Sequence, residues 1–430
     1  MYSPRLKSIL RVSMLSFATF LLLAGLAGAA SLWGGTPKFG NPIEDVYTAR
    51  QPISGAAWIN TGDGVVVIDT LTTSDSAVLM AKEIKKQGNG KIKYIIYTHG
   101  HPDHTAGAAA FMADRPEVIA NSFLPARLDK YNYQAEHRAR ITGMQFNVNV
   151  VPHKRNWVYP TKTFQGKMTF KLGNKTFELH TARGETDDVA WVWVPELKAV
   201  FIGDMIIGSF PNIGNPYKPT RYALDWAENL AAIRAKNPEH VFYNGAGNHM
   251  QGEYALGVLD DNIAAIRSLF DQVIDLINKD VHITEMIHRV SLPDHLKKKP
   301  HLRFGYSNKE FFVFNTYRWY HGYYDGNPAN LLPRPQKEVR TVLMSLIGDP
   351  KKVLDSAAEL LKSDRAQLGL EVLDVLIQAD PNNTDARRLR IELLEDIIPR
   401  CTDLMSRNTY TTFIAREKVF LSESGIVGDE

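Results

Sequence analysis

The stretch Tyr97–Gly107, YTHGHPDHTAG, places three histidines and an aspartate within the six residues from His99 to His104. It directly follows KIKYIIYT, an apolar run typical of a buried strand. Imidazole nitrogen and carboxylate oxygen are natural ligands for zinc and similar divalent ions. Because residues i and i+2 of an extended loop can point the same way, His99 and His101 are predicted to share one ion. Asp103 and His104, on the following turn, are predicted to reach a second ion.

Composition narrows how such ions can be held. The chain of 430 residues has a single cysteine, Cys401, which excludes an internal disulfide framework and thiolate clusters. Histidine and carboxylate must therefore supply the ligands. Its net charge of +3 is nearly neutral for this length, which gives no reason to expect nucleic acid as a partner. The length predicts two or three domains.

The first 30 residues have the order of a secretory signal. Arg5, Lys7 and Arg11 precede the apolar run LSFATFLLLAGLAG, which leads into the small residues Ala27–Gly28–Ala29. The run is short for a helix that spans a bilayer, although an uncleaved membrane anchor is the alternative. In either case we expect the protein to be exported, to the periplasm or outside the cell.

The pattern along the chain predicts an α+β protein. From Ala56 to Tyr243, short strand-like runs alternate with helical stretches, which favours sheets inside and helices outside. From Glu253 the pattern becomes helical, and a Gly-, Asn- and Pro-rich loop at residues 320–335 separates two helical blocks. We therefore predict an α/β sandwich followed by an all-α region.

The motif H-x-H-x-D-H, with the strand end VVVIDT and its Asp69 before it, resembles the metallo-β-lactamase fold. The resemblance implies a four-layer αββα sandwich with a site for two metal ions, usually zinc. It also implies further ligands in two later segments. The turn that commonly carries a histidine reads TARGETDD here and offers Glu185 to the first ion, and the strand end FIGD offers Asp204 to bridge both ions.

The last ligand of that fold is normally a histidine in a GHG-like loop. Here the loop reads Gly245–Ala246–Gly247, and the next histidine is His249. One expectation is that His249 reaches the second ion beside Asp103 and His104. The alternative is that the position is vacant and the second site is weak or absent.

With Glu185 in that turn, the sequence also resembles the linear alkyl sulfatases, which carry glutamate there. The segment Arg318–Pro335, RWYHGYYDGNPANLLPRP, and the helices after it are similar to the dimerisation domain of that family. The resemblance implies a catalytic domain at residues 41–252, a dimerisation domain at 253–416, a tail at 417–430 and a homodimer.

The activity implied by the resemblance is hydrolysis of alkyl sulfate esters to alcohol and sulfate by a water that the metals hold. Asp103 and Asp204 are the expected catalytic residues. Asn212, Lys218 and Arg221 lie in one segment and offer donors to a sulfate, which suits the forked guanidinium of arginine. Two alternatives stay open: hydrolysis of another ester, a lactone or a phosphodiester, and a non-catalytic protein that binds metal or ligand.

Overall fold

The computed structural model describes residues 34–88 and 90–423. The predicted signal or anchor at residues 1–30 lies outside these ranges, as does the end of the predicted tail. Within them, no helix is both long enough and apolar enough to cross a membrane.

The first sheet has seven strands in sequence order. The first four pair antiparallel, and the remaining neighbours, from β4 to β7, pair parallel. Strands β3 and β4 form an antiparallel hairpin around Gly62–Gly64. The strands are β1 (Lys38–Ile43), β2 (Val46–Arg50), β3 (Gly55–Asn60), β4 (Val65–Ile68), β5 (Ile92–Ile96), β6 (Glu117–Asn121) and β7 (Lys162–Phe164).

The second sheet has six strands in the order β13-β12-β11-β10-β9-β8. Its neighbours pair antiparallel except β11 and β12, which run parallel. All six residues of β10, VAWVWV, are buried, as expected for a strand covered on both faces. The strands are β8 (Lys167–Leu172), β9 (Lys175–Ala182), β10 (Val189–Val194), β11 (Ala199–Phe201), β12 (His240–Tyr243) and β13 (Asn248–Gln251).

The α-helices fall into two stretches of the chain. Those before His321 are α3 (Ser74–Lys86), α4 (Pro102–Thr105), α5 (Leu124–Tyr133), α6 (Ala135–Phe146), α7 (Ala223–Ala235), α8 (Gly252–Asn278), α9 (Ile283–Arg289), α10 (Asp294–Lys297) and α11 (Lys309–Tyr320). Those after it are α12 (Gln336–Ile347), α13 (Pro350–Lys362), α14 (Ala366–Ala379), α15 (Thr384–Ile397) and α16 (Leu404–Glu423).

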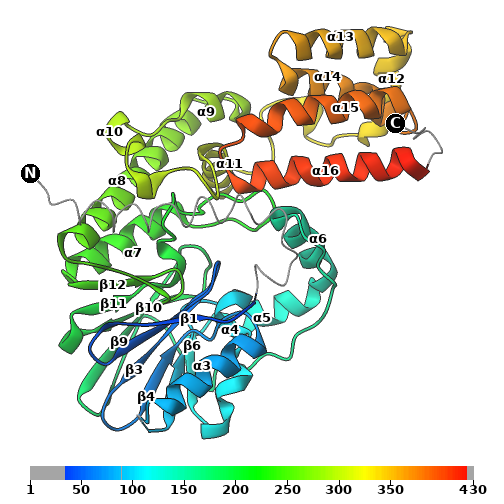
Figure 1. Ribbon diagram of the computed structural model, residues 1–430. Helices are drawn as coiled ribbons and strands as arrows, with labels where there is room; N and C mark the ends of the chain where they lie inside the picture. The colour runs from blue at the N-terminus through cyan, green and yellow to red at the C-terminus, as the bar shows by residue number, and fades with distance from the viewer. Residues whose placement is uncertain (1–33, 89, 424–430) are drawn as a thin grey trace, which may run out of the picture. The chain divides into compact units, whose positions relative to one another are not determined.

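Three apolar cores define the layers. One core lies between the sheets and includes Val66 and Phe201. A second joins the outer face of the first sheet to α3 and α5, and a third joins the outer face of the second sheet to α7 and α8 (Figure 1). The sequence of helix α3 explains its packing against the sheet, because Ala77, Met80 and Ile84 recur at helical spacing and form its buried side. The arrangement is an αββα sandwich, and the predicted fold class is confirmed.

The described chain divides into two compact units. One comprises the residues up to Arg140 together with Asn149–His321, and the other comprises Ile141–Val148 together with the chain from Gly322 onward. The division falls within the loop predicted as a seam, at residues 320–335. Helix α8 shares the apolar core of the second sheet, whereas the sequence placed it in the helical domain. The reason is that its long apolar face covers that sheet.

Strand ends and tight turns bring the chemical groups together. The turn Tyr97–Gly107 leaves the end of β5, and Asp69 leaves the end of its parallel neighbour β4. In the second sheet, Asp204 follows β11. Gly203 has φ of +57°, and a Cβ there would lie 2.8 Å from Thr98 Oγ1, so glycine lets this turn approach the end of β5. The functional groups therefore meet at one edge of the sandwich.

Candidate metal centre

The first group of potential ligands comprises His99, His101 and Glu185, whose ligand atoms lie within 4.8 Å of one another. His99 Nε2 is 2.8 Å from His101 Nδ1, and His101 Nδ1 is 3.5 Å from Glu185 Oε1. The two histidines belong to the turn after β5, and Glu185 lies in the loop between β9 and β10. The structure thus brings together the three residues expected to hold the first ion.

The second group of potential ligands comprises His99, His104 and Asp204. Asp103 is not one of its members but lies beside it, and His104 is fully buried. Its Nε2 lies 3.4 Å from Asp103 Oδ2 and 3.4 Å from Asp204 Oδ2. Its Nδ1 lies 2.8 Å from Asp69 Oδ2. A hydrogen bond from Nδ1 to Asp69 fixes the ring and turns Nε2 toward the two other carboxylates.

Asp69 and Thr98 support the site, although neither was predicted from the sequence to be a site residue. Asp69 contacts His104, and Thr98 Oγ1 lies 3.2 Å from His99 Nδ1. Asp69 accepts hydrogen bonds from Thr98 N at 2.8 Å and from Thr98 Oγ1 at 2.7 Å, and Asp69 is fully buried. Asp204 is held in turn by Gly245 N, which donates to its Oδ1 at 2.8 Å. Asp69 could have been found from its position directly after the strand-like run VVVI, where strand-end carboxylates often face a site. A serine or threonine beside a histidine is too common to single out Thr98.

Burial controls the protonation of these groups. It lowers the pKa of His99 and of His101 well below the usual value, and neighbouring cations lower both further. Both imidazoles are therefore neutral, the form that binds metal. Burial also raises the pKa of Glu185 to about 7, although Arg221 opposes the shift. For His104, burial acts to lower the pKa, but Asp204, Asp103 and Asp69 together raise it well above the usual value.

The residues fit a bound cation. Among the described residues, His104 Nε2 is buried and makes no hydrogen bond, although two carboxylate oxygens face it. A buried polar atom without a partner is costly, and a divalent ion between an imidazole nitrogen and carboxylates would satisfy all three groups. Nitrogen and oxygen donors of this kind suit zinc and other borderline ions.

Arg221 is a structural partner of the first group. Its guanidinium Nη1 lies 2.5 Å from Glu185 Oε1 and donates to the Asn212 carbonyl oxygen at 2.8 Å. Its backbone is paired in both directions with the side chain of Asn315. Asn212 is buried as well. Binding of substrate by Asn212 and Arg221 stays a prediction, whereas the contact that the structure shows for Arg221 is with Glu185.

The structure places His249 on β13, where it pairs across the strands with Phe242. Its Nε2 lies 3.1 Å from His240 Nδ1, and it belongs to neither group of potential ligands found among the described residues. Ala246, in the loop before it, is fully buried in the core between the sheets. The register of the β12–β13 hairpin explains the placement, because it fixes the face on which His249 lies.

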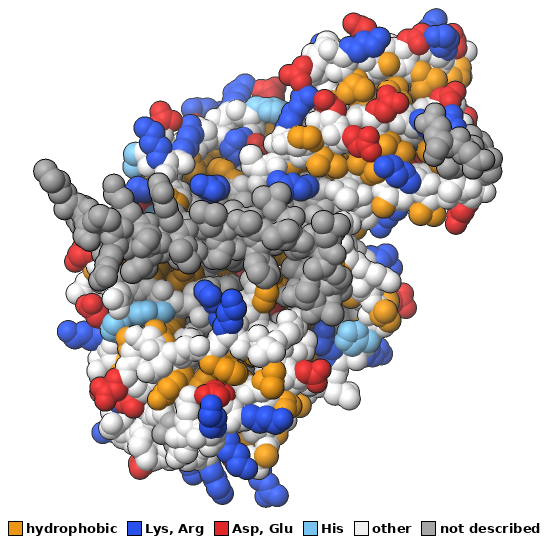
Figure 2. Space-filling model, viewed as in Figure 1, with side chains coloured by type: hydrophobic (Ala, Val, Ile, Leu, Met, Phe, Trp, Pro, Cys, Tyr) orange, Lys and Arg blue, Asp and Glu red, His pale blue; other side chains and the backbone are white. Residues whose placement is uncertain are grey.

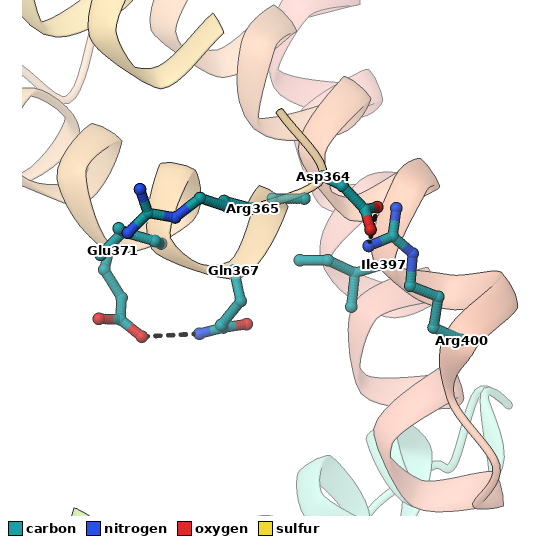
Figure 3. A pocket seen from close by; sticks show the side chains of 8 residues that line it. Asp364, Arg365, Gln367, Glu371, Ile397 and Arg400 are labelled. Carbon is teal, nitrogen blue, oxygen red and sulfur yellow. Dashed lines mark hydrogen bonds and ion pairs between the residues drawn. The ribbon is translucent and has the colours of Figure 1, made fainter. Parts of the chain in front are cut away.

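A separate pocket lies in the second compact unit, at the turn between α13 and α14. Figure 3 shows Asp364 and Arg400 pointing toward each other across it, with Nη1 of the arginine 2.6 Å from the carboxylate. Gln367 donates to Glu371 at 3.0 Å on another side of the pocket. No group of potential metal ligands found in the described chain includes these residues.

The αββα sandwich with two adjacent histidine–carboxylate groups at its edge defines a metallo-hydrolase type of site. Comparison with known proteins agrees. Residues 53–245 match the family model of the metallo-beta-lactamase superfamily, and residues 282–418 match the model named alkyl sulfatase dimerisation. Over these two ranges the chain is similar to proteins of the metallo-β-lactamase superfamily and to alkyl sulfatase dimerisation regions, respectively.

Three relatives illustrate the similarity. A linear primary-alkylsulfatase of Pseudomonas sp. is 25% identical over 381 residues, which cover 82% of this chain and 72% of the relative. An (R)-specific secondary-alkylsulfatase of Pseudomonas sp. is 25% identical over 382 residues, covering 81% of this chain but only 58% of the relative. The solved structure of a stereoselective inverting sec-alkylsulfatase of Pseudomonas sp. has the same fold, with a TM-score of 0.78 at 21% identity, covering 89% of this chain and 66% of that one.

Proposed function

We propose that this protein is a zinc-dependent hydrolase that cleaves alkyl sulfate esters to alcohol and sulfate. The observation that carries the proposal is the pair of ligand groups with Glu185 among them, in a chain whose similar proteins include primary and secondary alkylsulfatases. The proposal extends to this chain an activity that is stated only for those relatives.

We propose two ions for each chain. The two ligand groups found among the described residues share His99. A neutral imidazole that is protonated at one nitrogen has one lone pair, so His99 can serve only one ion. An ion held by His99, His101 and Glu185 leaves Asp103, His104 and Asp204 for the other. This division differs from the expectation from the sequence, in which Asp204 bridges both ions and His249 is a candidate ligand of the second.

Zinc would supply Lewis-acid charge that lowers the pKa of water and polarises a sulfate oxygen. The residues of the chain would prepare the site for it. Asp69 fixes the ring of His104, Gly245 N fixes Asp204, and Arg221 holds Glu185. Each contact restrains a ligand before substrate arrives, which is the kind of support that tunes metal sites.

The direct test is release of inorganic sulfate from a medium-chain alkyl sulfate by the purified protein. We expect release with zinc, loss of release after treatment with a chelator, and recovery when zinc is returned. A panel of carboxylic esters, lactones and phosphodiesters serves as the control. If zinc-loaded protein with both ions confirmed by elemental analysis cleaves one of these and no alkyl sulfate, the sulfatase proposal is wrong and that class replaces it.

We also propose that the protein is a homodimer and that α12 contributes to the interface. None of the residues of α12 is buried, and Val339, Val342 and Leu346 are exposed by 39%, 59% and 78%. These three lie on one face of the helix, and Figure 2 shows hydrophobic side chains at the surface over the C-terminal helices. Exposed apolar rows of this kind mark interaction surfaces. The helix lies within the region that matches alkyl sulfatase dimerisation.

Leu346→Glu is expected to convert the dimer into a monomer, because it places a charge in an apolar contact. The molar mass from light scattering after size exclusion would show the change. Thr341→Glu, an exposed position on the other side of the same helix, is the matched control and should stay dimeric. A Leu346→Glu protein that remains a dimer would show that α12 lies outside the interface.

A further inference from the structure

Three cationic side chains of the first compact unit differ from the other cations near the metal centre, because they take no part in the ion pairs found among the described residues. Arg127 is neutralised by Asp187 and Asp188, and Arg221 by Glu185. Arg138, Arg155 and Lys218, by contrast, form no ion pair among the described residues. They come from helix α6, from the segment before β7, and from the segment between β11 and α7.

Aromatic rings connect two of these cations to the metal centre. The ring of Tyr131 lies nearly parallel to that of His101, with centroids 6.5 Å apart, and Arg138 Cζ lies 3.7 Å from the centroid of Tyr131. The ring of Trp157 is 6.3 Å from that of Tyr131, and Arg155 Cζ is 5.7 Å from it. A guanidinium placed over a ring keeps its N–H edge free to fork onto an oxyanion.

The electrostatics shows that the three cations share one environment. Burial lowers the pKa of Arg138 and of Arg155, and it lowers that of Lys218 to about 8. In each case Asp103 acts in the opposite direction, so all three charges lie within its reach. Arg138 also lowers the pKa of Lys218. Like charges held together and partly removed from water are unfavourable, and an anion among them would relieve the cost.

We propose that Arg138 and Arg155 form an oxyanion-binding subsite beside His101 and Asp103. The ligand is a sulfate, carboxylate or phosphate group, and identifying it as part of a sulfate ester substrate rests on the proposed function. Two sources share this chemistry: the sulfate of the ester that is cleaved, and a second anionic group elsewhere on the same substrate. Arg138 and Arg155 are additional to the donors predicted at Asn212, Lys218 and Arg221, and the guanidinium of Arg221 is already bound to Glu185.

The first experiment measures binding of inorganic sulfate to the zinc-loaded full chain by isothermal titration calorimetry. Arg138→Gln and Arg155→Gln are each expected to raise the Kd by about tenfold to a hundredfold, the usual effect of losing a charge-assisted hydrogen bond. Arg140→Gln, on the same helix but exposed, is the matched control and should bind as the wild type does. Unchanged sulfate affinity in both variants, with the fold confirmed by circular dichroism, would overturn the proposal.

The second experiment identifies the source of the anion. It compares KM for an alkyl sulfate with KM for the same chain carrying a terminal carboxylate. If the subsite takes the sulfate of the ester, Arg138→Gln raises both KM values equally. If it takes a second anionic group, only KM for the carboxylated substrate rises. Sulfate binding that depends on Arg138 in a protein without sulfatase turnover would reject the proposed function and retain the subsite.

Discussion

Replacing His101 with alanine is expected to lower sulfate release by roughly a thousandfold and to remove one ion from each chain. His101 is the side chain that lies between His99 and Glu185, with its Nδ1 2.8 Å from the first and 3.5 Å from the second. Without it, the first group retains only two ligands. Lewis-acid stabilisation of a transition state amounts to several kcal/mol, and each 1.36 kcal/mol changes the rate tenfold.

The measurement pairs sulfate release with metal content from elemental analysis. His153→Ala is the matched control, because His153 is an exposed histidine of the same compact unit and its Nδ1 contacts the backbone oxygen of Val151. It should keep both ions and full activity. A His101→Ala protein that retains two ions and its activity would contradict the assignment of the first group.

Arg221→Ala is expected to destabilise the metal-free protein by about 3–5 kcal/mol, since it removes one partner of a buried ion pair. Both side chains are almost fully buried, with exposures of 4% for Arg221 and 8% for Glu185. The substitution leaves the Glu185 carboxylate without its cation and the Asn212 carbonyl without its donor. Urea unfolding after chelation would measure the change.

Arg183→Ala is the matched control for this effect. Arg183 also pairs with a carboxylate, Asp225, at 3.1 Å, but its side chain is 48% exposed. Exposed ion pairs contribute about 0–1 kcal/mol, so little change is expected. Equal effects of the two substitutions would mean that the Glu185–Arg221 pair does not stabilise the site. Returning zinc should recover part of the lost stability in Arg221→Ala, because a cation at Glu185 can replace the missing charge.

Neighbouring residues of the metal centre were predictable from the sequence. His99, His101, Asp103 and His104 lie on one turn, so a local pattern is enough to indicate that they act together. The sandwich was predictable too, because alternation and apolar runs report which faces are buried. Glu185 and Asp204 came from the resemblance to a known fold, which supplied the long-range pairing that no local pattern contains.

The tertiary structure decided the roles that depend on distant contacts. Arg221 looked suited to bind sulfate because arginine commonly does so, but 36 residues separate it from the Glu185 that it contacts. The sequence predicted the apolar face of α8 but not its packing against the second sheet. An apolar stripe shows that a helix face is buried and does not show which element covers it.

The sequence by itself therefore determined the ligand types, the turn that carries four of them and the layers of the fold. Only the tertiary structure decided which cations are neutralised and which are left beside Asp103. The physical reason is that the neighbours of a charged side chain decide whether its charge is neutralised. Arg127, Arg138 and Arg221 are the same residue type in the sequence, and folding places carboxylates beside only Arg127 and Arg221 among these three.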